Sequence, residues 1–331
     1  MNSNLYITKS GKLSRKDNTL LFKNKEIKKV IPVENIKTIY LLGETSLNTK
    51  LLNFLSQKQI ILHIFNYYGF YTGSFIPKEG YVSGKLLVKQ VEFYTNLKKR
   101  ITLASKFVEG IANNLLYVLR HYSKHGANLK DIRNRINSKT IKIKNVKDIK
   151  EMLSVEGGIW DNFYSSFERL LPQNFQMETR KIRPPNNPMN ALISFANSLL
   201  YTQTLSQIYH TQLNPTIAYL HEPSEKRFSL CLDISEVFKP DMTFRLIFKL
   251  INKNMIKISD FDEKKNFCLL NEKGRVKFLQ EFDNRLNQTK KHPKLKRNIS
   301  NKRLIRIECY KLIKHFMGEK QYKPYSLENK F

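Results

Sequence analysis

The spacing of apolar residues changes once along this chain, near residue 85, and that change constrains the fold more than any other feature. Before it, short segments rich in Ile, Val, Tyr and Phe, such as residues 27–42 and 60–75, are closed by Gly and Pro, which is typical of β-strands. After it, apolar residues recur at helical spacing over long stretches. We therefore predict an α+β multidomain protein, with a small β-rich domain over residues 1–84 and a larger all-α domain over residues 85–331.

Residues that favour a helix N-terminus predict where two of the helices begin. Within the β-rich part, residues 46–59 carry leucines at helical spacing, and Ser46 is a candidate N-cap for that helix. In the second part Asn187 precedes Pro188, a pair favoured at the cap and the first position of a helix. The segment GYVSGK, residues 80–85, is the expected linker between the two domains.

Composition excludes several classes of protein. Of the 331 residues 41% are hydrophobic, including 21 Phe and 16 Tyr, so the chain is long and apolar enough for two packed domains. No apolar run approaches the ~20 residues of a membrane span, and MNSNLYITKS is no signal peptide. The three cysteines are dispersed without a CxxC pair, which argues against a disulfide framework or cysteine zinc site and favours a cytoplasmic location.

The charge balance favours a polyanionic partner. The chain has 58 Lys and Arg against 28 Asp and Glu, a formal net charge of +30, and such a field attracts nucleic acid by counterion release. An AT-rich genome would explain abundant Lys, but not scarce acids. Residues 290–306 hold eight Lys or Arg and no acid. Such a run is by default a solvated, mobile segment, but here it precedes an apolar helix, and tracking of DNA is the alternative.

Against this positive background, residues 218–240 place acids in an apolar stretch. Asp233 and Glu236 share one face of the expected helix, and His221 lies upstream beyond a turn. Carboxylates with one imidazole form a hard ligand set that suits Mg²⁺ or Mn²⁺. The alternative is that the acids pair with Lys and that His221 caps a helix. For this pattern in isolation, the alternative is favoured.

Two further motifs have open interpretations. Glu156 precedes a Gly-Gly pair, and glycines beside an acid allow close approach of a ligand. Alternatively, Glu156 marks a helix N-terminus, where the dipole favours an acid. Arg183, before two prolines, is suited equally to binding a phosphate or to fixing its own loop. Tyr201 is expected to pack in the core.

The order of these motifs carries a family resemblance. SVEG, then RPPNNPMNALISFANSLLY (183–201), then LNPTIAYLHEPSEKRFSLCLDISEVFKP (213–240) resembles the CRISPR adaptation integrase, the larger of the two universal spacer-acquisition proteins. Residues 43–77 look like the β-domain of that family. The resemblance spans nearly the whole chain. It implies an N-terminal β-rich domain and a C-terminal α-helical domain that holds the active site.

The resemblance also assigns residues. It implies that Glu156, His221 and Glu236 are the catalytic metal ligands, and that Asp233 is a second acid at the metal. The chain departs from many relatives just after Glu-Gly, where residues 159–161 are Ile, Trp and Asp rather than small residues or an arginine. This departure leaves the ligands unchanged and bears only on DNA contacts of that helix.

The function expected from the resemblance is a Mg²⁺- or Mn²⁺-dependent DNA endonuclease and integrase. It would insert short DNA duplexes, the spacers, into a repeat array by attack of a 3′-hydroxyl on a phosphodiester. Its expected partners are double-stranded DNA, a second copy of the chain and a small ferredoxin-like adaptation subunit, with no membrane. Two alternatives remain: a catalytically silent architectural DNA-binding protein, and a hub that assembles a partner complex.

Overall fold

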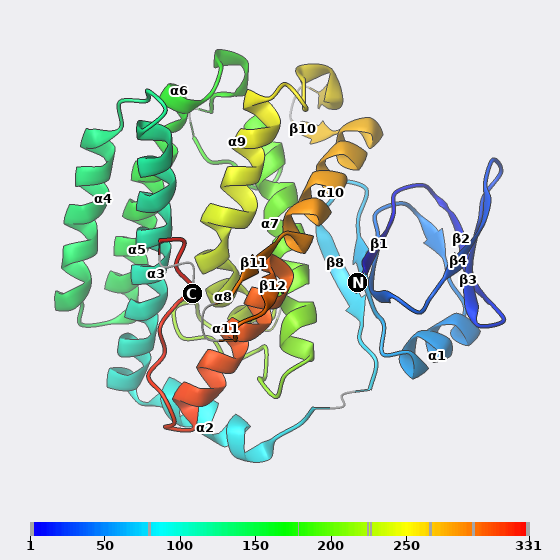
Figure 1. Ribbon diagram of the computed structural model, residues 1–331, viewed down its shortest axis with the longest axis horizontal. Helices are drawn as coiled ribbons and strands as arrows, with labels where there is room; N and C mark the ends of the chain where they lie inside the picture. The colour runs from blue at the N-terminus through cyan, green and yellow to red at the C-terminus, as the bar shows by residue number, and fades with distance from the viewer. Residues whose placement is uncertain are drawn as a thin grey trace.

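A strand-rich part projects from one side of a larger helical body (Figure 1). The computed structural model describes residues 3–78, 81–177, 179–223, 225, 227–264, 267–292 and 295–328. The predicted order, a strand-rich N-terminal region followed by a helical region, is confirmed. Within the described residues, every helix is too short or too polar to span a membrane.

Two four-stranded sheets and one helix form the strand-rich part. The first sheet has the order β1-β5-β7-β8, parallel except for its last pair, with the strands β1 (Ser3–Ile7), β5 (Ile36–Leu41), β7 (Ile61–Phe65) and β8 (Tyr71–Phe75). The second has the order β4-β3-β2-β6, with the strands β4 (Lys28–Pro32), β3 (Thr19–Lys23), β2 (Gly11–Lys16) and β6 (Thr45–Ser46). Both sheets share one apolar core with helix α1 (Thr49–Gln57).

The cap predicted for α1 is wrong by two residues. Asn48, not Ser46, is the N-cap, and its side chain accepts a hydrogen bond from the N–H of Leu51 at 3.0 Å. Ser46 instead ends β6, where it pairs with Lys12 of the neighbouring strand. Both residues are good caps, so the pairing of β6 with β2 decided between them.

The helical body contains ten α-helices in the described part of the chain. They are α2 (Gly84–Thr95), α3 (Leu97–Ser123), α4 (Lys130–Lys142), α5 (Ile149–Tyr164), α6 (Phe167–Leu170), α7 (Pro188–Tyr209), α8 (Ser229–Lys239), α9 (Arg245–Asn252), α10 (Glu272–Asn287) and α11 (Asn301–Phe316). Short single turns are η1 (Ile143–Asn145), η2 (Gln173–Phe175), the π-turn η3 (Pro240–Phe244) and η4 (Ile258–Asp260). The last strand of the N-terminal part ends at Phe75 and α2 begins at Gly84, while Gly80 of the expected linker lies outside the described residues. The domain division after residue 84 stays a prediction.

Two small hairpins were not expected within this body. They pair β9 (Phe261–Lys264) with β10 (Phe267–Leu270), and β11 (Thr289–Lys291) with β12 (Asn298–Ser300). The second hairpin and the start of α11 carry the basic run of residues 290–306. Ile299 and Lys302 are buried there, so the expectation of a wholly solvated segment is wrong for this part of the run.

Helix α7 passes through the centre of the body and is buried on nearly all sides, its polar residues Gln203 and Ser206 included. Its predicted start is confirmed: Asn187 accepts the N–H of Asn190 at 2.8 Å, and Pro188 is the first helical residue. His63 of β7 joins the first sheet to this helix, with 2.8 Å between its Nε2 and Oγ of Ser206. The sheet therefore has a fixed position against the helix that lines the candidate site.

Asn114 ties α3 to two other segments. Its side-chain amide donates to the carbonyls of Val237 and Tyr325, both at 3.0 Å, and its oxygen accepts the N–H of Leu327 at 2.7 Å. Asn114 is fully buried. We predict that Asn114→Ala lowers the free energy of unfolding by about 3 kcal/mol, because it leaves three buried backbone groups without partners.

Asn113, exposed on the same helix, provides the matched control. Asn113→Ala should change the free energy of unfolding by no more than about 0.5 kcal/mol in urea denaturation. Equal urea midpoints for the two variants would contradict a structural role for the buried amide.

Candidate active site

Glu156 lies inside helix α5, not at its end. The helix begins at Ile149 behind the cap Asp148, whose carboxylate accepts the N–H of Glu151 at 2.8 Å. The alternative interpretation of Glu156 as a helix start is therefore wrong. A Cβ at Gly157 would meet no atom within 4 Å, so the chain is open to solvent or ligand directly beside Glu156.

Asp233 holds the segment that carries His221. Its Oδ2 accepts the N–H groups of Tyr219 at 2.6 Å and Leu220 at 3.0 Å. Its Oδ1 accepts the N–H of His221 at 3.0 Å and lies 2.8 Å from Nδ1 of the same residue. Asp233 is fully buried. These four contacts orient the imidazole and leave Nε2 as the nitrogen that Asp233 does not engage.

Glu236 lies one helical turn after Asp233 on α8, and it is only 6% exposed. Its Oε1 forms an ion pair with Nζ of Lys239. Its Oε2 is buried without a hydrogen-bond partner. A buried polar atom left unpaired costs about 1–3 kcal/mol, and more when it belongs to a charged group. Such an oxygen is a typical place for a ligand to bind.

The two glutamates influence each other electrostatically. Burial raises the pKa of Glu156 to about 7, the negative charge of Glu236 adds to that rise, and Lys239 and His221 oppose it. Trp160 donates its indole N–H to Oε1 of Glu156 at 2.5 Å. Burial lowers the pKa of His221, but the hydrogen bond and the charge of Asp233, with the charges of both glutamates, leave that pKa above its usual value. Glu156, His221 and Glu236 therefore lie near one another.

The side chains as they lie do not enclose a metal ion. In the described part of the chain, no group of three His, Cys, Asp or Glu side chains converges closely enough to coordinate one. Glu236 turns toward Lys239, and Glu156 toward Trp160. The donor set nevertheless fits a hard divalent cation, because it combines one imidazole with two carboxylates, one of which has an unpaired buried oxygen. Asp233 has both oxygens occupied by N–H donors, so its contacts favour a role in positioning His221, and its role as a ligand stays a prediction.

A basic groove of about 350 Å³ adjoins this region at Lys239. Arg180, Arg183 and Arg227 line it together with Lys239, and Tyr71 and Tyr201 contribute aromatic rings. Arg183 also lies over the ring of Phe70, 5.1 Å from its centroid, so it both faces the groove and packs on its neighbour. The hydroxyl of Tyr201 accepts the N–H of Phe228 at 2.9 Å, and the ring is only partly buried.

Sequence reasoning missed Arg180. Its guanidinium donates to Oδ1 of Asn190 at 2.9 Å and to Oγ of Ser194 at 3.0 Å, both on α7. The only signal for it was a basic cluster, RKIR, directly before the two prolines. Because α7 holds Arg180, its charge has a fixed place in the groove.

Comparisons with known proteins agree with one another. The family model described as CRISPR associated protein Cas1 matches residues 5–284. The CRISPR-associated endonuclease Cas1 3 of Thermodesulfovibrio yellowstonii is 50% identical over 323 residues, 97% of this chain and 98% of its own. The CRISPR-associated endonuclease Cas1 of Fusobacterium nucleatum is 46% identical over 328 residues, 99% of this chain and 97% of its own. Among solved structures, a CAS1 protein from Thermotoga maritima is similar with a TM-score of 0.88 and 38% identity, covering 97% of this chain and 99% of that one.

The raised pKa of Glu156 predicts a pH-dependent stability of the metal-free protein. In the unfolded chain this pKa returns toward 4.5, below its folded value of about 7. Wild type therefore loses stability as the pH rises from about 4.5 through 7. We predict that Glu156→Gln, measured with a chelator present, is more stable than wild type at pH 8 by on the order of 2–3 kcal/mol.

The advantage of the variant should disappear below pH 4.5, where the wild-type carboxyl is protonated in both states. Urea denaturation at several pH values checks this, with Asp161→Asn, an exposed acid on the same helix, as the control. A pH-independent difference between Glu156→Gln and wild type would contradict the assigned electrostatics.

Proposed function

This chain belongs to the family of the CRISPR-associated protein Cas1, and on that premise we propose that it is a DNA endonuclease and integrase of CRISPR adaptation. Relatives at 46% and 50% identity are named endonucleases. A more distant structure with the same fold, at 19% identity and a TM-score of 0.86, is a casposase bound to integration product. The observation that carries the proposal is the buried Glu236 and the partly buried Glu156, close to each other and to His221, beside a basic groove.

The proposed cofactor is Mg²⁺ or Mn²⁺, held by Glu156, His221 and Glu236. A bound divalent ion there would polarise the scissile phosphodiester and activate the attacking 3′-hydroxyl. The unpaired oxygen of Glu236 and the mutual repulsion of the two glutamates support this assignment. In the absence of a ligand, Lys239 partly neutralises Glu236.

The surrounding residues position the reactants. Asp233 fixes the imidazole of His221 through its four contacts, so His221 keeps its orientation without a ligand. Arg180, Arg183 and Arg227 would bind backbone phosphates in the groove, where Arg forks match phosphate oxygens. The strand would thereby bring one phosphodiester to the carboxylates.

The proposed partners are double-stranded DNA, namely the prespacer and the repeat array, together with a second copy of this chain and a small ferredoxin-like subunit. Distant proteins of the same fold include a Cas1–Cas2 complex with reverse transcriptase and Cas6, at 18% identity, and a Cas1–DNA complex, at 12% identity. These support the proposal only through the shared fold.

A catalytically silent architectural DNA-binding protein is the alternative. It would use the same basic surface but would gain nothing from holding a partly buried glutamate near a buried one that has an unpaired oxygen. The free-energy cost of that arrangement favours catalysis.

We predict that Glu156→Ala, His221→Ala and Glu236→Ala each reduce DNA cleavage and strand transfer by more than about 100-fold, since ligands of one ion act as a unit. A double variant should be little worse than a single one. Asp233→Asn should cost about 10- to 100-fold, as expected for a residue that orients a ligand.

The assay is integration of a short duplex into a repeat-bearing plasmid, with Mg²⁺ or Mn²⁺ and the partner subunit. Asp161→Ala on the exposed side of α5 is the control and should retain activity. Wild-type product levels from the Glu156 or His221 variant would refute the proposed site. Circular dichroism should stay close to wild type in every variant, and every variant should still bind DNA.

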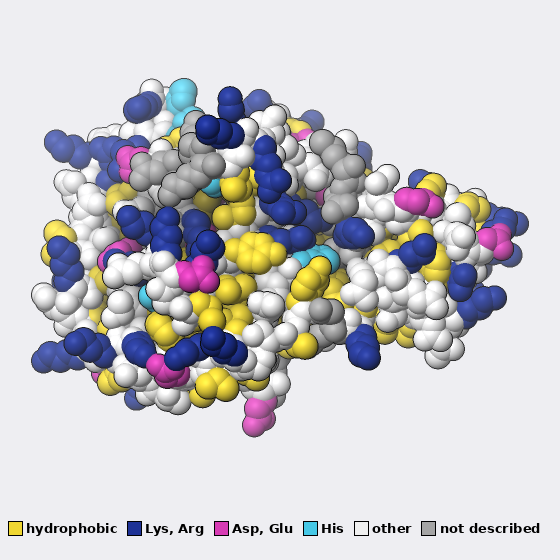
Figure 2. All heavy atoms as spheres, turned by 60° about the horizontal axis from the view of Figure 1, so that its bottom comes forward, with side chains coloured by type: hydrophobic (Ala, Val, Ile, Leu, Met, Phe, Trp, Pro, Cys, Tyr) yellow, Lys and Arg dark blue, Asp and Glu magenta, His cyan; other side chains and the backbone are white. Residues whose placement is uncertain are grey.

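Electrostatic attraction should dominate DNA binding. Figure 2 shows Lys and Arg side chains spread over both parts of the molecule, with only scattered acids. We predict that affinity for a short duplex falls more than about 100-fold between ~50 and ~200 mM salt, and depends little on its sequence. Fluorescence anisotropy over a salt series tests this. A flat salt response would exclude it.

A further inference from the structure

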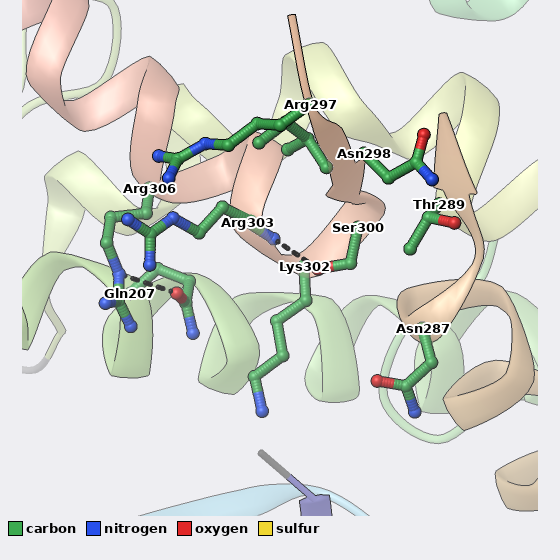
Figure 3. Close-up of a pocket in the computed structure, with 10 residues that line it drawn as sticks. Gln207, Asn287, Thr289, Arg297, Asn298, Ser300, Lys302, Arg303 and Arg306 are labelled. Atoms are coloured by element: carbon green, nitrogen blue, oxygen red, sulfur yellow. Dashed lines mark hydrogen bonds between the residues drawn. The ribbon is translucent and has the colours of Figure 1, made fainter. Parts of the chain in front are cut away.

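A second basic pocket lies apart from the candidate active site. It has a volume of about 360 Å³, and it is lined by the end of α7, the β11–β12 hairpin and the start of α11 (Figure 3). Gln207 of α7 lines this pocket, whereas Ser198 lines the catalytic groove. Nine residues of helix separate the two side chains, a rotation of about 180°. The two cavities therefore open on opposite sides of α7.

Four cations line this pocket: Arg297, Lys302, Arg303 and Arg306. Figure 3 shows Arg303 and Arg306 close together on one wall, with Arg306 donating to Gln207 at 3.0 Å. Among the described residues, no carboxylate forms an ion pair with any of the four.

Elsewhere in the described part of the chain, buried acids pair with neighbouring cations. Asp241, fully buried, pairs with both Arg245 and Arg285, and Asp260 pairs with Lys277. The contrast matters because clustered like charges without a counterion destabilise the folded chain. The pocket at the start of α11 therefore lacks an anion that the fold supplies elsewhere.

The pKa shifts of two groups at this pocket also indicate a positive local potential. Burial lowers the pKa of Lys302 to about 8, and the charge of Arg306 lowers it further against the opposing effect of Asp283. Burial and the charges of Arg306 and Lys302 lower the pKa of nearby His210 to about 4. The N-terminus of the 16-residue helix α11 adds its partial positive charge at the same place.

The remaining lining groups match a phosphate rather than a base. Asn287, Thr289, Asn298 and Ser300 offer hydrogen-bonding side chains, and among the described residues no aromatic one lines the pocket. Bases are bound chiefly by stacking or by edge contacts, whereas phosphates are bound by Arg, Lys, small polar groups and helix N-termini. Arg297 and Arg303 are exposed at the surface, so a long polyanion reaches them without entering fully.

We infer that this pocket binds backbone phosphates of a nucleic acid held by the protein, on the side of α7 opposite the catalytic groove. The inference rests on the proposed function, since it takes DNA as the polyanion. The pocket would thereby hold a stretch of DNA backbone other than the one that reacts in the catalytic groove. This contact would not depend on the DNA sequence.

The test removes the two exposed charges, which leaves buried Lys302 and the bond from Arg306 to Gln207 in place. Arg297→Gln/Arg303→Gln should weaken binding of a random-sequence duplex and reduce the slope of log affinity against log salt by about two, one for each phosphate that the variant no longer neutralises. The matched control is Lys28→Gln/Lys29→Gln, with the same charge change at exposed positions of β4. Circular dichroism and thermal melting establish that both variants are folded.

Binding is measured with full-length protein and a chelator, so its outcome does not depend on catalysis. Failure of the proposed function would appear separately, as unchanged cleavage by the Glu156 variant. A second arm measures thermal stabilisation by inorganic phosphate and pyrophosphate. A pocket variant that matches the control in affinity and salt slope overturns the inference, as does one that loses only its stabilisation by phosphate, since the pocket then serves a small anion.

Discussion

The buried carboxylate of Asp233 is the interaction on which the candidate site depends. A fully buried acid is costly unless it is compensated, and here three backbone N–H groups and one imidazole nitrogen surround it. That arrangement fixes the path of residues 219–221 against α8. Because Glu236 follows Asp233 by one turn of the same helix, a single rigid element determines both the position of His221 and that of the second acid.

Helix α7 separates a region of clustered acids from a region of clustered cations. On one side lie acids held close together in a protein with a net charge of +30, and an oxygen of Glu236 has no partner there. On the other side lie four cations that form no ion pair with any described carboxylate. We propose that a divalent cation binds in the first region and a phosphate in the second. Since α7 is buried on nearly all sides, it keeps the two regions at a fixed separation.

Much of the fold and of the candidate site could be predicted from the sequence, and the predictions that were wrong or missing have physical causes. The change of periodicity and the Asn187 cap are local signals, and both were confirmed. Glu156 was ambiguous because two glycines disfavour a helix interior, and tertiary packing of α5 overrode that propensity. The role of Arg180 depends on its contacts with α7, across a loop that contains the two prolines. The burial of Lys302 depends on Asn4 of β1, whose Oδ1 accepts a hydrogen bond from Nζ of Lys302 at 2.7 Å. Neither contact has a local signature.

The same electrostatic argument explains why Lys239 lies where it does. It pairs with Glu236 and sits over the ring of Trp160, 5.7 Å from its centroid, while Trp160 also holds Glu156. One cation and one indole thus contact two acids, and burial together with the charge of Glu236 raises the pKa of Glu156. If Glu236 held the proposed metal ion, Lys239, which already lines the groove, would be free to contact the phosphate backbone. Occupation of the proposed metal site and binding of the DNA strand would therefore favour each other, because the lysine that leaves the carboxylate gains a phosphate as its partner.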